Sequence, residues 1–187
     1  MPNPNRQWGQ WEGWGTSLCW WANVFGQRDD FADLWFTLEN VCVQTDTGTH
    51  VLPGLGLNIA RYNAGAFAWH EYGGSQIEVS PNIPLFKEMQ GFWKDGGSSD
   101  PASSSWRWDV DSNQISMLRK ALARGADIFE LFSNSPVWWM LKDRNPSGSP
   151  SGQDDNLQIW NHKDHATYLV TVARHALQHW GVHFSSI

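Results

Sequence analysis

The sequence predicts an α/β protein whose strands form a parallel sheet. Short apolar segments of strand length alternate along the chain with segments of helical periodicity. Two predicted helices return to the next strand through short turns, at Gly125 and Gly181, whereas the segments that follow the strands are long and polar. Single strands that alternate with helices pair in parallel through right-handed crossovers.

The first half of the chain contains two predicted strands and one predicted helix. Residues 14–21 form an apolar, aromatic run typical of a buried strand. Asp29 and Asp30 are suited to begin a helix, which carries its apolar stripe at Phe31, Leu34, Trp35 and Leu38. Residues 44–56, rich in Thr, Gly and Pro, are expected to be a connector, and residues 57–62 are the second strand.

The second half continues the alternation. Residues 63–111 are expected to be irregular, and loops of this length in a compact domain are usually functional. Asp111 or Ser112 is expected to cap a helix that ends at Gly125, and residues 127–132 are the third strand. After a long loop, Asp164 is expected to cap a helix that Gly181 closes, and residues 182–187 are the fourth strand.

In a TIM (β/α)8 barrel the segments that follow the strands are long and those that follow the helices are short, as in this sequence. The chemistry of such a barrel lies at the C-terminal ends of the strands. A complete barrel has eight units in typically about 250 residues. We therefore expect residues 1–187 to be the first four units, one half-barrel of a longer protein. A doubly wound sheet is disfavoured, because the glycine turn at residues 54–56 precedes its strand and lacks a third glycine.

Composition excludes several classes of function. The formal net charge is −6 and no Lys/Arg run occurs, which argues against nucleic acid or an anionic membrane as partner. No apolar stretch approaches transmembrane length, and the N-terminus has no signal-peptide pattern. Cys19 and Cys42 both have apolar neighbours, so we expect two buried thiols.

Trp is unusually abundant, with 14 residues in 187. Trp35, Trp160 and Trp180 lie on or next to predicted helices and are interpreted as core residues. Flat aromatic faces stack on sugar rings, so the Trp residues at strand ends and in the following loops favour a carbohydrate cleft, the alternative being that they pin a large loop. In each of the pairs Trp20-Trp21 and Trp138-Trp139 we expect one core residue. The strand-end and loop set is Trp20, Trp21, Trp69, Trp93, Trp106, Trp108, Trp138 and Trp139.

Few polar residues are placed for chemistry. Arg61 ends an apolar strand and either organises an active-site carboxylate or forms a structural ion pair. Asn134 and Ser135 follow the third strand and either contact sugar hydroxyls or form the turn before a proline. No pair of acids has the placement that glycoside hydrolysis needs; the acids considered are Glu71, Glu130, Asp143, Asp154 and Asp155.

The remaining histidines and cysteines suggest no cofactor. His175, His179 and His183 have four-residue spacing, yet Gly181 interrupts the helix and no acid accompanies them. A solvated helix face is favoured over a zinc site, and no metal or other cofactor is expected.

Three segments together resemble glycoside hydrolase family 30, most closely its fungal endo-β-1,6-galactanase-like branch. They are GWGTSLCWWA at residues 13–22, GLGLNIARYN at residues 54–63 and FELFSNSPVWWM at residues 129–140. The resemblance extends from about Trp8 to Ile187. It implies a (β/α)8 barrel with an attached β-sandwich, secretion, and retaining hydrolysis of a β-linked polysaccharide.

The same resemblance implies which residues contact substrate. Arg61 is similar to the family's active-site arginine and Trp138 to its substrate-pocket aromatic, while Trp20, Asn63 and Asn134 lie at similar cleft positions. The family's acid/base and nucleophile glutamates fall beyond Ile187, so this chain alone is expected to be inactive. The alternatives are a carbohydrate-binding half-barrel without catalysis and a non-functional fragment.

Overall fold

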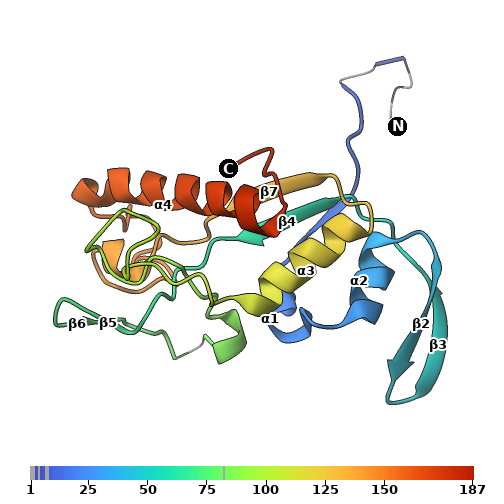
Figure 1. Ribbon diagram of the computed structural model, residues 1–187, viewed down its shortest axis with the longest axis horizontal. Helices are drawn as coiled ribbons and strands as arrows, with labels where there is room; N and C mark the ends of the chain where they lie inside the picture. Colours follow the sequence, from blue (N-terminus) through green and yellow to red (C-terminus); the bar gives the residue numbers. More distant parts are fainter. Residues whose placement is uncertain (1–2, 4, 7–8, 82) are drawn as a thin grey trace.

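A three-stranded parallel sheet forms the centre of the protein. The computed structural model describes residues 3, 5–6, 9–81 and 83–187. Strands β1 (Gly15–Ser17), β4 (Ile59–Asn63) and β7 (Ile128–Phe132) lie side by side in the order β1-β4-β7 (Figure 1). The parallel α/β prediction is therefore confirmed, and each strand adds beside the preceding one.

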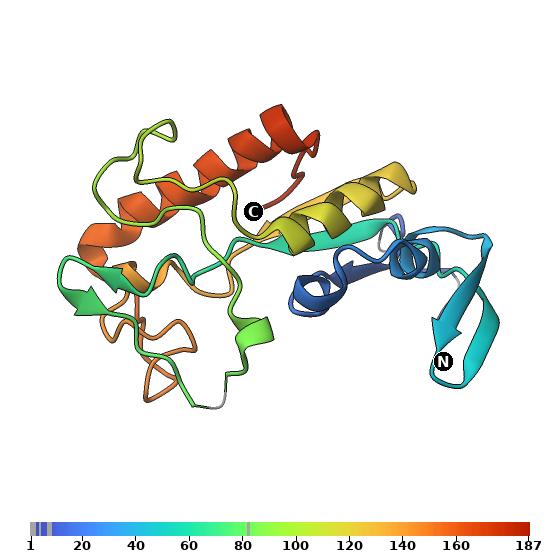
Figure 2. The same ribbon diagram turned by 60° about the horizontal axis from the view of Figure 1, so that its bottom comes forward.

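The helices fall between the strands in sequence. Helix α3 contacts α1, α2 and strand β4. Helix α4 lies on the side of α3 that faces away from α2 (Figures 1 and 2). Their bounds are α1 (Trp21–Phe25), α2 (Asp29–Phe36), α3 (Ser112–Ala123), α4 (His162–His175) and its π-helical continuation η4 (Ala176–Trp180), with short 3-10 turns η1 (Leu85–Lys87), η2 (Trp138–Met140) and η3 (Ile159–Asn161).

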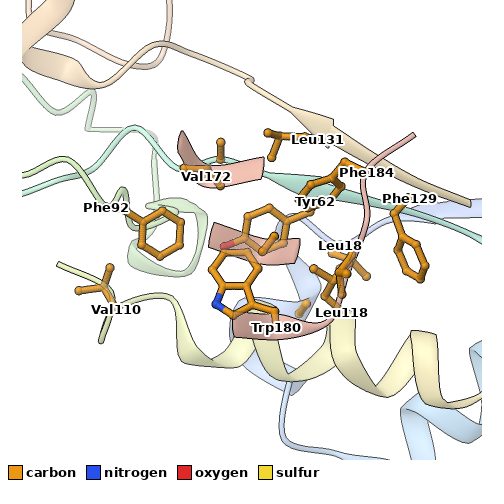
Figure 3. Close-up of a cluster of buried hydrophobic side chains, with 14 of the residues drawn as sticks. Leu18, Tyr62, Phe92, Val110, Leu118, Phe129, Leu131, Val172, Trp180 and Phe184 are labelled. Carbon is orange, nitrogen blue, oxygen red and sulfur yellow. The ribbon is translucent and has the colours of Figure 1, made fainter. Parts of the chain in front are cut away.

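Helices cover only one face of the sheet in the described part of the chain. Ala60 is buried on this face. Tyr62 and Leu131 are buried on the same face, next to the helices, and the ring of Tyr62 packs on Trp180 at 5.5 Å (Figure 3). Side chains alternate between the two faces of a strand, and the alternate residues Arg61, Glu130 and Phe132 are only half-buried. The larger part of the core thus lies between this sheet and the helices.

Two hairpins occur where irregular chain was expected. Strands β2 (Asn40–Thr45) and β3 (Gly48–Pro53) pair antiparallel, so the connector predicted over residues 44–56 was wrong. The hairpin forms because β-branched residues alternate along it and Gly48, at φ +119°, permits the turn. A smaller hairpin of β5 (Glu71–Tyr72) and β6 (Ser75–Gln76) lies within the long segment after β4.

The predicted ends of several elements shift. Of the strand predicted over residues 14–21, only β1 is extended, because the chain turns into α1 at Trp21. Residues 182–187 are not a full strand, but they run parallel to β7 through a bridge between Glu130 and Ser186. The predicted helices are confirmed at α2, α3 and α4, but Leu38, the last residue of the predicted apolar stripe, lies beyond the end of α2 and is 83% exposed. Helix α4 begins before Asp164, which lies in its first turn and is not its cap.

Cys42 is exposed and Cys19 is half-buried, which corrects the expectation of two buried thiols. The apolar neighbours of Cys42 were misleading because Val41 and Val43 alternate with it along β2 and point to the other face. Similarly, Trp160 is 72% exposed, although it was interpreted as a core residue. Its position in η3, before the buried face of α4 begins, leaves it in solvent.

Several Trp residues of the loops are packed. Trp93 and Trp106 are buried and stack at 4.9 Å. Trp138 and Trp139 are also buried, so the expectation that only one of them belongs to the core was wrong. The 3-10 turn η2 removes the strand-like alternation on which that expectation depended. These four Trp residues therefore pack the loops onto the core, which is the alternative to a carbohydrate cleft that the sequence left open.

Candidate carbohydrate-binding site

Trp20, Asn63 and Asn134 line one small cavity of about 20 Å³ at the C-terminal ends of β4 and β7. We call it the inner cavity. The sequence had placed these three residues near a cleft, and the structure brings them together from three separate segments. The full lining is Trp20, Asn63, Ala66, Phe67, Lys87, Met89, Asn134, Ser135 and Pro146.

Asn63 is held rigidly at the end of β4. Its side-chain oxygen accepts a hydrogen bond from the backbone N–H of Asn134 at 3.2 Å. Its backbone N–H and C=O are paired with the side-chain amide of Gln114, each at 3.0 Å. A bidentate amide pairing fixes both position and orientation, so Asn63 and Asn134 form one polar unit across β4 and β7.

The same unit continues into a buried polar network under α3. Gln114 donates a hydrogen bond to the carboxyl of Asp111 at 2.7 Å, and the Tyr62 hydroxyl donates to the same oxygen. Burial raises the pKa of Asp111 to about 7, although these two hydrogen bonds favour the charged form. Both hydrogen bonds end on one oxygen of Asp111, while its other oxygen is buried without a partner among the described residues. Asp111 forms no side-chain cap at the start of α3.

Trp20 is a partly buried aromatic residue that lines the inner cavity. The ammonium group of Lys87 lies 4.5 Å from the centre of its ring, a cation–π contact. Asn23 donates a hydrogen bond to the carbonyl of Phe86 at 2.9 Å, which ties α1 to η1 beside this contact. The contact with Lys87 and the hydrogen bond between Asn23 and Phe86 together hold Trp20 in position beside the cavity.

Arg61 lies apart from the inner cavity, on the half-buried face of the sheet. Its guanidinium stands 4.2 Å from the centre of the Phe132 ring. Its Nε is buried and has no hydrogen-bond partner among the described residues. Glu130 is its neighbour in the register of β4 and β7, but no ion pair joins them in the described structure. The structural ion pair considered from sequence is therefore not seen among these residues.

Trp138 does not line the inner cavity. Its side chain is fully buried, and its indole N–H donates to the carbonyl of Ala68 at 2.5 Å. Its backbone N–H donates to Ala66 at 3.0 Å. In this structure Trp138 supports the segment after β4, and its predicted contact with substrate has no counterpart here.

A larger cavity of about 610 Å³ adjoins the inner cavity, and Phe67 lines both. We call it the outer pocket. The sequence indicated that residues 63–111 were functional, and it singled out Trp69 and Glu71, which both line this pocket. It gave no signal for the other polar residues of the lining. Its lining is Asn23, Phe67, Trp69, His70, Glu71, Leu85, Glu88 and Gln90.

The histidines of α4 form an aromatic stack. The ring of His175 lies parallel to that of Trp108 at 3.6 Å, and the ring of His179, in η4, lies 4.2 Å from His175 at a tilt of 33°. Burial lowers the pKa of His175 to about 4, so it is neutral near pH 7. Among the described residues, no group of three or more His, Cys, Asp or Glu is arranged to hold a metal ion.

Fold and site together define an α/β protein with a small cavity, lined by aromatic and amide side chains, at the C-terminal ends of its parallel strands, the end of the sheet where barrel enzymes carry their sites. A family profile described as O-Glycosyl hydrolase family 30 matches residues 3–187, and the chain belongs to this family.

Two curated relatives are informative. The chain is 56% identical over 185 residues to an endo-beta-1,6-galactanase of Hypocrea rufa, covering 99% of this chain and 37% of the relative. It is 25% identical to an exo-beta-1,6-galactobiohydrolase of Bifidobacterium longum subsp. longum, covering 88% of this chain and 13% of the relative. The chain therefore spans little more than a third of the length of the endo-beta-1,6-galactanase.

Solved structures support the fold. A conserved exported protein from Bacteroides fragilis matches with a TM-score of 0.63 at 22% identity, over 92% of this chain and 32% of that one. An endo-beta1,6-glucanase matches with a TM-score of 0.55 at 16% identity, over 97% of this chain and 35% of that one. No helix in the described part of the chain is long and apolar enough to cross a membrane.

Proposed function

We propose that the chain forms the first four units of a (β/α)8 barrel and supplies part of the sugar-binding cleft of a retaining, secreted endo-β-1,6-galactanase. One observation carries the proposal: Trp20, Asn63 and Asn134 meet in one cavity at the strand ends, in a chain that is 56% identical to an endo-beta-1,6-galactanase. The one-sided helix cover of the sheet also supports a barrel, because a barrel packs its helices outside and its side chains inside.

Each residue has a specific part in this proposal. Trp20 stacks on the apolar face of a galactosyl ring. The side chains of Asn63 and Asn134 exchange hydrogen bonds with sugar hydroxyls, and the pairing of Asn63 with Gln114 keeps them in place. Arg61 lies on the barrel-interior face, where its buried Nε, without a partner among the described residues, pairs with a carboxylate contributed by the rest of the barrel.

Catalysis needs two carboxylates about 5 to 5.5 Å apart in a retaining enzyme. No pair of acids in residues 1–187 has this placement by sequence, and we propose that both carboxylates belong to another part of the enzyme. The 187-residue chain therefore binds the glycan and leaves the glycosidic bond intact.

The test combines an activity assay with a binding assay. Incubation of this chain with β-1,6-galactan is expected to release no reducing sugar, and turnover that co-purifies with the protein would refute the predicted inactivity. Titration of Trp fluorescence with β-1,6-galactotetraose is expected to give a saturable response. Trp20→Ala is expected to weaken binding by about tenfold, roughly the value of one stacking contact.

Trp160→Ala is the matched control. This Trp is 72% exposed and lies outside both the inner cavity and the outer pocket. Its replacement is expected to leave the affinity unchanged. The absence of any saturable response in the unmodified chain, or an equal loss in both variants, would overturn the assignment of Trp20 to the cleft.

A further inference from the structure

The outer pocket is built on two chain segments that are fixed side by side. The backbone N–H of Phe67 donates to Met89 at 3.1 Å, and Phe67 and Gln90 form a parallel bridge. A Cβ at Gly65 would lie 2.1 Å from the carbonyl oxygen of Gln90, so only glycine permits this approach. The walls of the pocket are therefore held in place without a bound ligand.

The pocket combines an aromatic wall with polar groups. The ring of Trp69 lines it, and the guanidinium of Arg107 lies 4.8 Å from the centre of that ring. Glu88 also lines the pocket, and its side chain is only 13% exposed. The carboxylate of Glu88 makes no hydrogen bond with a described residue, and its ionisable partner, His70, is 3.9 Å away.

Other polar atoms of the wall are only partly used. Gln90 accepts a hydrogen bond from the backbone N–H of Asp111 at 2.8 Å, which leaves its amide N–H₂ without a partner among the described residues. Asn23 uses its amide N–H₂ on Phe86 and retains its oxygen. An aromatic face with a carboxylate, an amide donor and an amide acceptor is the set of groups that binds a hydroxyl-rich ring.

From these contacts we propose that the outer pocket binds a second, neutral hexosyl unit of the glycan, with Trp69 stacking on the ring and Glu88 accepting hydrogen bonds from its hydroxyls. The unit is neutral because the acids Glu71 and Glu88 would repel a uronate. Phe67 lines both cavities, so the outer pocket lies next to the inner cavity. This inference rests on the proposed function.

The test compares β-1,6-galacto-oligosaccharides of increasing length by Trp fluorescence or calorimetry. In the unmodified chain, affinity is expected to rise as the oligosaccharide becomes long enough to reach the outer pocket. Glu88→Gln keeps the side-chain size and is expected to remove at least about tenfold of that gain, since a hydrogen bond to a charged group is among the stronger ones. Trp69→Ala is expected to act similarly.

Two controls separate the possible failures. Glu39→Gln changes an exposed acid outside both sites and is expected to have no effect. Trp20→Ala is expected to weaken the binding of short and long oligosaccharides alike, and circular dichroism checks that each variant folds. If Glu88→Gln and Trp69→Ala bind the longer oligosaccharides as tightly as the unmodified chain does, the inference is overturned and the proposed function still stands. No binding of any oligosaccharide by the unmodified chain overturns both.

Discussion

The buried carboxyl of Asp111 is expected to make the stability of the protein depend on pH. Burial raises its pKa from 3.8 to about 7, so the folded protein retains a proton between these values that the unfolded chain has lost. The stabilisation is complete below about pH 4 and is lost as the pH rises to about 7. A shift of about three pH units, at about 1.36 kcal/mol each, corresponds to about 4 kcal/mol.

Asp111→Asn is the perturbation that isolates this effect. The amide oxygen can still accept the hydrogen bonds from Tyr62 and Gln114, and it does not titrate. Urea unfolding of both proteins, followed by Trp fluorescence from pH 4 to pH 8, gives the free energy of unfolding. The unmodified protein is expected to lose up to about 4 kcal/mol relative to the variant across this range.

The control and the refuting result follow from the location of Asp111 in the core. Asp46→Asn, in the exposed turn between β2 and β3, is expected to leave the pH profile of stability unchanged. If the profiles of the unmodified protein and Asp111→Asn run parallel from pH 4 to pH 8, Asp111 is already charged in the folded protein and the reasoning fails.

Two further predictions concern packing and thiol exposure. Gly26→Ala would place a Cβ 1.9 Å from the carbonyl oxygen of Asn113, so it is expected to destabilise the protein by about 3 kcal/mol in urea unfolding. Gly48→Ala, with open space around it but φ of +119°, is expected to cost about 1 kcal/mol, and equal losses would contradict the close contact between α1 and α3. Cys42 is expected to react rapidly with a thiol reagent while half-buried Cys19 reacts slowly, as measured by two-phase absorbance kinetics, and two equally fast thiols would count against this.

The elements that sequence predicted well are those whose pattern is decided by one buried face. Helices α2, α3 and α4 carry apolar residues at helical spacing because each packs on the core through a single stripe. Strands β4 and β7 were also found, since short apolar runs between turn residues fit a parallel sheet.

The β2–β3 hairpin escaped prediction because it contributes little to the core. In β3 all residues are exposed, so the alternating Thr49 and Val51 face no core and do not give the alternation of apolar and polar residues that marks a half-buried strand. Its pairing depends on backbone hydrogen bonds and on the conformation of Gly48, which periodicity does not detect. Trp160 was also misjudged from sequence. Composition does not distinguish a Trp on the buried face of a helix from a Trp in the exposed turn that precedes the helix.

For the site, sequence predicted where polar residues gather but not which side chains face inward. Asn63 and Asn134 follow the ends of neighbouring parallel strands, so their convergence follows from topology alone. Trp138 follows β7, as Asn134 does, but the turn η2 directs its ring into the core. There the carbonyl of Ala68 accepts a hydrogen bond from the indole N–H. Glu88 and Gln90 gave no signal, because their place beside Phe67 depends on the close approach of Gly65 to Gln90.

The arrangement of the sheet bears on the choice between a barrel and a doubly wound sheet. A doubly wound sheet reverses its strand order at a switch point and covers both faces with helices. Here β1, β4 and β7 follow one another on one side, and residues 182–187 approach β7 on that same side. Arg61, Glu130 and Phe132 remain half-buried on the face without helices. If further strands were added beyond residues 182–187 in the same order, the sheet would close around the face without helices. The side chains of Arg61 and Glu130 would then lie inside a barrel, where an arginine that binds substrate is expected.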